Sequence, residues 1–149
     1  MTKTYRLTPI TRVVNGIYSV MTRRGRGANY RYILTVEGRK SGAAKSTPVD
    51  VMEIDGQRWL VAPYGEVNWV KNARASGQVA LSRGGSSSRW KAEEVRGLEA
   101  VPAIRCYITS VPVTAAYWEL DADSTDVAVS AASEHHPVFR LAPLPAASA

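Results

Sequence analysis

The segment 37–48 concentrates residues that can bind an anion. It holds three cations, two glycines and three hydroxyl side chains between two runs rich in Val, Ile, Thr and Tyr. Glycines let a ligand approach the backbone closely, and an arginine offers a planar fork that matches phosphate or carboxylate. A solvated basic hairpin loop has the same composition, because charge runs usually lie on the surface. From these residues alone both interpretations stand.

The elements that must position this segment are mostly strands. Asp55-Gly56 separates two β-rich runs and is a strong hairpin signal. A helix over 67–76 would place Trp69 and Asn72 on one face. We predict strands at 32–36, 49–54, 57–62, 78–83, 88–95 and 133–141, helices at 9–24, 67–76 and 99–109, an acidic loop at 121–126 and a disordered tail at 142–149. This order predicts a single α+β domain, 1–149, with an antiparallel barrel-like sheet.

The composition suggests an anionic partner. The chain has 149 residues and a net charge of +6. No nucleic-acid signature accompanies the charge, so nucleic acid is the weakest candidate. The single cysteine, Cys106, excludes an internal disulfide and suits a reducing compartment. With no signal peptide or membrane span apparent, we expect a cytoplasmic protein, and the helix at 9–24 is a candidate for peripheral membrane contact.

Several common catalytic motifs are excluded. Gly25-Arg26-Gly27 resembles the start of a dinucleotide fingerprint, but Tyr30 stands where the third glycine should be. His135 and His136 are adjacent on the expected last strand, so they would face opposite sides and could not share a metal. Cys106 lies in an apolar helix and is expected to be inert. The chain therefore offers no triad, carboxylate pair or metal cluster.

Two sequence blocks resemble the deazaflavin (coenzyme F420)-dependent nitroreductase and quinone reductase family. The first is Gly38-Arg39-Lys40-Ser41-Gly42 with Lys45, Thr47 and Pro48. The second is Ala62-Pro63-Tyr64-Gly65 with Asn68, Trp69, Asn72 and Arg74-Ala75. The run His136-Pro137-Val138-Phe139-Arg140-Leu141 is also similar to that family. The resemblance covers about residues 9 to 141.

The resemblance implies a flavin-reductase-like split β-barrel that binds coenzyme F420, a deazaflavin whose tail carries a phosphate and several glutamates. The implied cofactor-binding residues are Arg39, Lys40, Ser41, Gly42, Lys45, Thr47, Pro48, Ala62, Pro63, Tyr64, Gly65, Asn68, Trp69 and Asn72. The first block would hold the phosphate and tail, and Thr47 and Pro48 would lie along the ring. Trp69 and Asn72 would contact the deazaflavin from the other side. The cationic groove would comprise Arg39, Lys40, Lys45, Lys71 and Arg74.

The implied reaction is hydride transfer to a quinone-like, nitro or unsaturated apolar acceptor. Such chemistry resides in the cofactor, while the protein orients it and excludes water. Tyr117 and Tyr107 are the candidate proton donors or acceptor-pocket residues. Three alternatives stay open: flavin mononucleotide as the cofactor, a non-catalytic cofactor- or lipid-binding protein of the same fold, and either a monomer or a homodimer.

Overall fold

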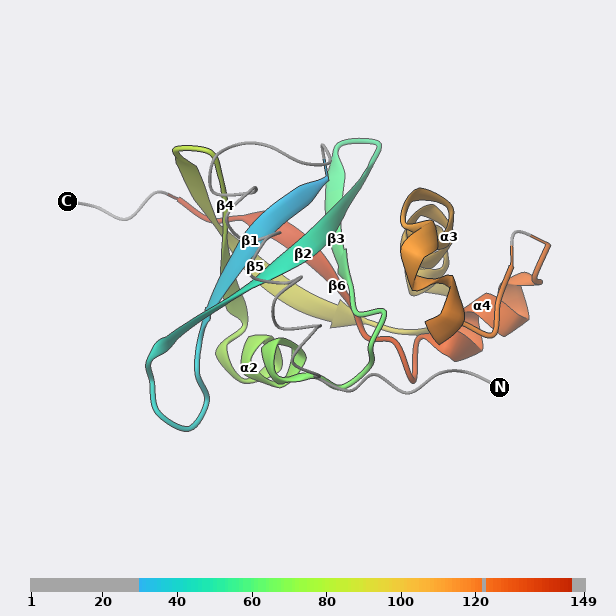
Figure 1. Cartoon of the computed structure of the whole chain (residues 1–149), viewed down its shortest axis with the longest axis horizontal. Helices are drawn as coiled ribbons and strands as arrows, with labels where there is room; N and C mark the ends of the chain where they lie inside the picture. Colours follow the sequence, from blue (N-terminus) through green and yellow to red (C-terminus); the bar gives the residue numbers. More distant parts are fainter. Residues whose placement is uncertain (1–29, 122, 146–149) are drawn as a thin grey trace.

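The computed structural model describes residues 30–121 and 123–145, so the helix expected at 9–24 lies outside the described residues. Its strands are β1 (Arg31–Glu37), β2 (Ala44–Ile54), β3 (Gln57–Val61), β4 (Gln78–Arg83), β5 (Ser86–Val95) and β6 (Val138–Pro143). They close into an antiparallel barrel in the order β1-β2-β3-β6-β5-β4 (Figure 1). The antiparallel barrel predicted from the sequence is confirmed.

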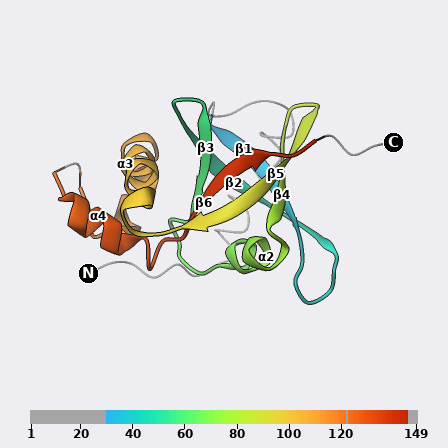
Figure 2. The same cartoon turned by 180° about the vertical axis from the view of Figure 1, so that it is seen from behind.

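Helical segments cover one end and one side of this barrel. The helices are α2 (Asn68–Ser76), α3 (Val101–Ser110) and α4 (Asp126–Ala132), with 3-10 segments η1 (Gly97–Ala100) and η2 (Pro112–Tyr117). Both cartoon views show α2 at the barrel end from which the β1–β2 hairpin projects, while α3 and α4 lie together at the side (Figures 1 and 2). The hairpin tip and α2 thus lie away from α3, the helix that carries Tyr107.

Alternation along the strands divides the core into two layers. Val51 points into the barrel with Leu60 and Phe139, whereas its neighbour Met52 packs outside against the layer that contains Ile104 of α3. Successive side chains of a strand face opposite sides, so a run of buried residues in β2 serves both layers. Val51 and Met52, the two buried residues of β2, therefore belong to different layers of the core.

Turn and cap residues behave as their types predict. Asp55 has φ 51° and Gly56 has φ 80°, the left-handed pair of a tight hairpin turn. Helix α2 buries Val70 and Ala73, and it ends at Gly77, whose φ is 74°. The expected bounds of β4 are reproduced, and those of α2 differ by one residue.

The C-terminal third corrects three predictions. The expected acidic loop leads into α4, which the Thr125 hydroxyl caps by accepting from the Ala128 N–H at 3.2 Å. The last strand begins at Val138, because the N–H groups of His135 and His136 instead donate to the Ala132 carbonyl at the end of α4. At its other end β6 reaches Pro143, so residues 142 and 143 are strand and not tail.

Candidate functional site

The loop between β1 and β2 is a tight turn held by its own backbone. The Gly38 N–H donates to the Ala43 carbonyl and the Gly42 N–H to the Gly38 carbonyl, both at 2.8 Å. Gly42 has φ +73°, and a Cβ on Gly38 would lie 3.1 Å from the Ala43 oxygen. Both positions therefore favour glycine. Strand β2 already begins at Ala44, so Lys45, Thr47 and Pro48 lie on a strand and not in the loop we expected.

One side chain joins this loop to the second sequence block. The Asn72 Oδ1 atom accepts from the Arg39 backbone N–H at 3.1 Å and from the Arg39 Nη1 atom at 2.8 Å. Asn72 is only 4% exposed on α2. Because its partner is neutral, the arginine is oriented without losing its positive charge. The two blocks that the sequence predicted to cooperate are thus in direct contact.

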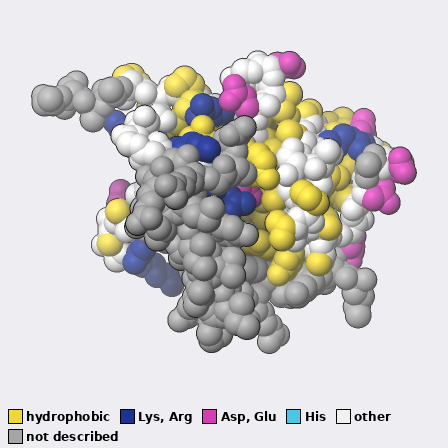
Figure 3. Space-filling view, turned by 45° about the horizontal axis from the view of Figure 1, so that its top comes forward, with side chains coloured by type: hydrophobic (Ala, Val, Ile, Leu, Met, Phe, Trp, Pro, Cys, Tyr) yellow, Lys and Arg dark blue, Asp and Glu magenta, His cyan; other side chains and the backbone are white. Residues whose placement is uncertain are grey.

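The basic loop, residues 38–45, keeps most of its charge uncompensated. Lys40 and Lys45 are exposed, and neither forms an ion pair within residues 30–121 and 123–145. Glu37 is the adjacent carboxylate. The Ser41 hydroxyl accepts from the Ala43 N–H at 3.2 Å, which supports the turn. Figure 3 shows cationic side chains at the hairpin tip, apart from the apolar surface over α3.

Thr47 and Pro48 present their side chains to opposite faces of β2. Thr47 pairs with Leu34, whose side chain is fully buried inside the barrel, whereas Pro48 pairs with Ile33 and shares its face with Asp50. A flat ring lying against one face of β2 would meet only one of these two side chains. That Thr47 and Pro48 both lie along the ring stays a prediction of the resemblance.

The second block forms a braced loop after β3. Ala62 and Pro63 are buried, and Tyr64 is 38% exposed. The Tyr64 ring meets the Tyr117 ring edge to face, with centroids 4.7 Å apart. Gly65 has φ +83°, and a Cβ there would lie 3.2 Å from the His135 carbonyl oxygen. This loop brings a predicted cofactor residue against a predicted acceptor residue.

The remaining residues of the second block lie on different sides of helix α2. Asn68 is exposed, and Trp69 is half-buried with its ring 5.9 Å from that of Phe139. Trp69 therefore packs on the barrel core along part of its surface. Lys71 is exposed on the same helix.

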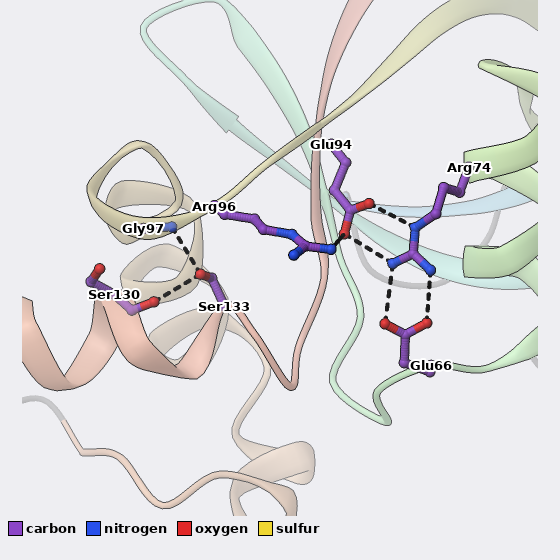
Figure 4. Close-up of polar contacts among 7 residues, drawn as sticks. All are labelled: Glu66, Arg74, Glu94, Arg96, Gly97, Ser130 and Ser133. Atoms are coloured by element: carbon purple, nitrogen blue, oxygen red, sulfur yellow. Dashed lines mark hydrogen bonds and ion pairs between the residues drawn. The ribbon is translucent and has the colours of Figure 1, made fainter.

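Arg74 does not belong to the cationic groove that we expected. Its guanidinium binds Glu66 at 2.9 Å and Glu94 at 2.7 Å, and Arg96 also approaches Glu94 at 3.6 Å (Figure 4). A hydrogen bond from Arg74 holds the pKa of Glu66 below its usual range, and both carboxylates raise the pKa of Arg74. Beside this network, Ser133 accepts from the Gly97 N–H at 2.9 Å. These contacts tie α2 and α4 to the C-terminal end of β5.

A half-buried acid that sequence reasoning missed, Asp50, contacts α3. Asp50 of β2 pairs with Arg31 of β1, and the Tyr107 hydroxyl donates to Asp50 at 3.4 Å. Burial raises the pKa of Asp50, and Arg31 opposes that shift. Burial and the Asp50 charge also raise the pKa of Tyr107, which is 2% exposed. Asp50 could have been noticed as a charged residue inside an apolar run.

The geometry suits an anionic tail bound beside an aromatic surface. Lys40 and Lys45 are cations without an ion pair within the described residues, a neutral amide binds Arg39, and the Tyr64 ring meets the Tyr117 ring edge to face. No group of three His, Cys, Asp or Glu side chains among the described residues could hold a metal ion. None of the described helices is long and apolar enough to cross a membrane.

Several solved structures share the fold of this chain. A solved F420-H2 dependent reductase (FDR-A) shares 23% identity, with a TM-score of 0.56 over 76% of this chain and 95% of that chain. A structure described as a domain-swapped dimer shares 21% identity, with a TM-score of 0.58 over 89% and 96% of the two chains. A FAD-binding protein from Mesorhizobium loti has 16% identity and a TM-score of 0.51 over 87% and 89%. These likenesses establish a common fold.

The family assignment rests on the sequence. A comparison with curated proteins finds no match. The F420H(2)-dependent quinone reductase family matches residues 5–131, which include both sequence blocks, Asp50 and Tyr107. The resemblance inferred from those blocks is therefore confirmed, and coenzyme F420 takes precedence over flavin mononucleotide as the cofactor. This chain belongs to the F420H(2)-dependent quinone reductase family and is an F420-dependent oxidoreductase.

Proposed function

We propose that the protein reduces quinone-like acceptors at a site where the basic loop holds the cofactor tail and the Tyr64–Tyr117 pair meets the acceptor. The observation that carries the proposal is the double hydrogen bond from Arg39 to Asn72, which aims a charged arginine without neutralising it. Nitro and unsaturated apolar acceptors are further candidates for the same site.

The basic loop would bind the phosphate and glutamates of the tail through Arg39, Lys40 and Lys45. Charge-assisted hydrogen bonds are roughly twice as strong as neutral ones. The tight turn at Gly38 and Gly42 would present these cations to the phosphate, with Ser41 supporting the turn. Pro48, Pro63 and Tyr64 would form the wall against the ring, with Trp69 and Asn68 at the α2 side.

Bound F420 supplies the hydride, and this chain supplies orientation, exclusion of water and a proton. Tyr117 is the better-placed proton source, because it is half-buried against the exposed Tyr64 ring. Tyr107 is buried and its hydroxyl is directed to Asp50, so we assign it to the support of α3. Burial raises the pKa of Tyr107, so its phenol stays protonated at neutral pH.

An anaerobic assay tests this proposal. Reduced F420 should be oxidised fastest with menadione, and more slowly with a nitroaromatic or an enone of similar size. Tyr117→Phe should lower kcat about a hundredfold, the usual lower range for loss of a general acid. Tyr5→Phe offers a conservative control on another tyrosine of the chain. Equal rates with all acceptors would contradict the preference for quinones. An unchanged kcat in Tyr117→Phe would contradict the role of Tyr117 as the proton source.

A further inference from the structure

We propose that His136 is a positioning residue that sets the separation of Tyr64 and Tyr117 and thereby shapes the acceptor end of the site. The inference rests on the proposed function, because that function places these two tyrosines at the acceptor. His136 lies in the turn before β6, and neither the hydride transfer nor the cofactor tail requires it directly. Its contacts extend to the two segments that carry the tyrosines.

The first contact fixes the segment before Tyr64. The His136 Nδ1 atom lies 3.3 Å from the Ala62 carbonyl oxygen. A carbonyl oxygen only accepts, so Nδ1 must carry the proton and donate. The adjacent Pro137 carbonyl accepts from the Ala62 N–H at 2.9 Å. Ala62 is therefore held through both of its backbone polar groups, two positions before Tyr64.

The second contact fixes the segment that carries Tyr117. The His136 ring stacks on Trp118 with centroids 3.9 Å apart and an angle of 24° between the planes. The Trp118 Nε1 atom donates to the Thr114 hydroxyl at 3.3 Å, and that hydroxyl donates to the Val111 carbonyl at 2.8 Å. Trp118 is 6% exposed and directly follows Tyr117, so the imidazole buttresses the end of η2.

One imidazole thus connects the two segments that meet at the tyrosine pair. His136 is 9% exposed. Burial lowers the pKa of His136, while the Ala62 and Pro63 carbonyls oppose that shift, as does Glu119, and His135 adds to it. The neutral, Nδ1-protonated ring is the form that makes both contacts at neutral pH. Because aromatic pairs depend on ring geometry, a small shift at His136 would change the Tyr64–Tyr117 contact.

Two substitutions of His136 each retain one of its contacts and remove the other. His136→Phe retains a ring that can stack on Trp118 but removes the donor to Ala62. His136→Asn retains an amide donor near the Nδ1 position but removes the ring. We expect His136→Phe to raise the KM for menadione about tenfold, which corresponds to the loss of one good hydrogen bond. We expect His136→Asn to raise it about threefold, and the dissociation constant for F420 to change less than twofold in both.

The matched control is Val129→Ala, a fully buried residue of α4 that shares the core layer of Trp118 but has no hydrogen bond or ring contact with either tyrosine segment in the part of the chain that the structure describes. It should lower Tm as His136→Phe does, yet leave the KM for menadione unchanged. Near-UV circular dichroism of the cofactor-free protein gives a second readout: both His136 variants should alter the tyrosine signal and Val129→Ala should not. If His136→Phe does not fold, His136→Asn decides the test.

Specific outcomes would overturn the inference. The first is a His136→Asn or His136→Phe protein whose KM for menadione stays within twofold of the wild type and whose tyrosine signal is unchanged. The second is a rise of KM in Val129→Ala as large as that in the His136 variants. If the wild-type protein oxidises no reduced F420, the proposed function fails. The dichroism comparison then still decides whether His136 positions the tyrosine pair.

Discussion

Arg39 and Asn72 lie 33 positions apart, and one amide oxygen of Asn72 accepts both the backbone and the side-chain hydrogen bond of Arg39. The contact ties the hairpin that carries the cations to the helix that closes the barrel end. It makes the orientation of the basic loop depend on a buried residue of α2.

Replacing Asn72 should therefore weaken cofactor binding without touching a cation. We expect Asn72→Ala to raise the F420 dissociation constant about tenfold, since a hydrogen bond to a charged group is lost. Asn72→Asp should raise it further, because the added carboxylate would pair with Arg39 and repel the tail. Fluorescence titration with F420 measures both, and Gln78→Ala, a surface amide on β4, is the control. An unchanged affinity in Asn72→Asp would contradict the account.

Substitutions at two glycines with nearly the same backbone angle distinguish an effect on stability from an effect on F420 binding. Gly42 has φ +73° and Gly77 has φ +74°, and neither has a backbone atom close to the position of an added Cβ. Gly42→Ala and Gly77→Ala should each lower the free energy of unfolding by about 1 kcal/mol, the penalty for a left-handed alanine. Only Gly42→Ala should weaken F420 binding. Urea unfolding and fluorescence titration provide the two measurements, and equal affinity losses would refute this role of the loop.

The Arg74 network should contribute to stability and not to cofactor affinity. The Arg74 side chain is 37% exposed, so Arg74→Met should lower the free energy of unfolding by no more than about 1 kcal/mol, and less in 1 M salt. Since Arg74 lowers the pKa of Glu66, that stabilisation is present above the ordinary value of 4.5 and is lost as the pH falls through the shifted pKa. Thermal unfolding between pH 3 and 7 checks this, with Lys91→Met as the control. A large loss of F420 affinity in Arg74→Met would show that Arg74 contributes to cofactor binding.

Removal of Arg31 should make stability strongly dependent on pH. Burial raises the pKa of Asp50 in the folded protein, so its contribution is most favourable below the ordinary value of 3.8 and is lost as the pH rises through the folded pKa. Arg31→Met raises that pKa further and should lower the free energy of unfolding by about 3 kcal/mol at pH 7. The loss should be smaller at pH 4.

The double variant Arg31→Met with Asp50→Asn should abolish this dependence, because neither a buried charge nor its partner remains. Chemical denaturation at several pH values measures all three proteins. An equal loss of stability at pH 4 and pH 7 in Arg31→Met would show that the Asp50 charge is not the cause.

The local signals in the sequence were sufficient for most of the barrel. Asp55-Gly56 specifies its hairpin through backbone conformation, and Gly77 ends α2 for the same reason. The C-terminal third was harder to predict, because competing partners decide it. The N–H groups of His135 and His136 could join a strand or end a helix, and in the structure both donate to the Ala132 carbonyl at the end of α4.

In the site, too, the local sequence signals were sufficient for some features, and the long-range contacts could not be predicted. The spacing of the two blocks indicated that the basic loop and α2 belong to one site. Charge alone could not show that Arg74 is neutralised by Glu66 and Glu94, since those residues come from other elements. Nor could it show that Asp50 pairs with Arg31 across two strands. Long-range partners of this kind depend on barrel register, which the sequence pattern leaves undetermined.

The central claim is that the basic loop recognises the anionic tail of the cofactor. The most direct measurement compares the binding of F420 with that of the deazaflavin chromophore lacking its phosphate and glutamates. In the wild type F420 should bind at least tenfold more tightly, with an advantage that shrinks in high salt. Arg39→Ala with Lys40→Ala should remove that advantage and leave binding of the tail-less chromophore unchanged, whereas Lys91→Ala should change neither. Equal affinities for the two compounds in the wild type would contradict the account.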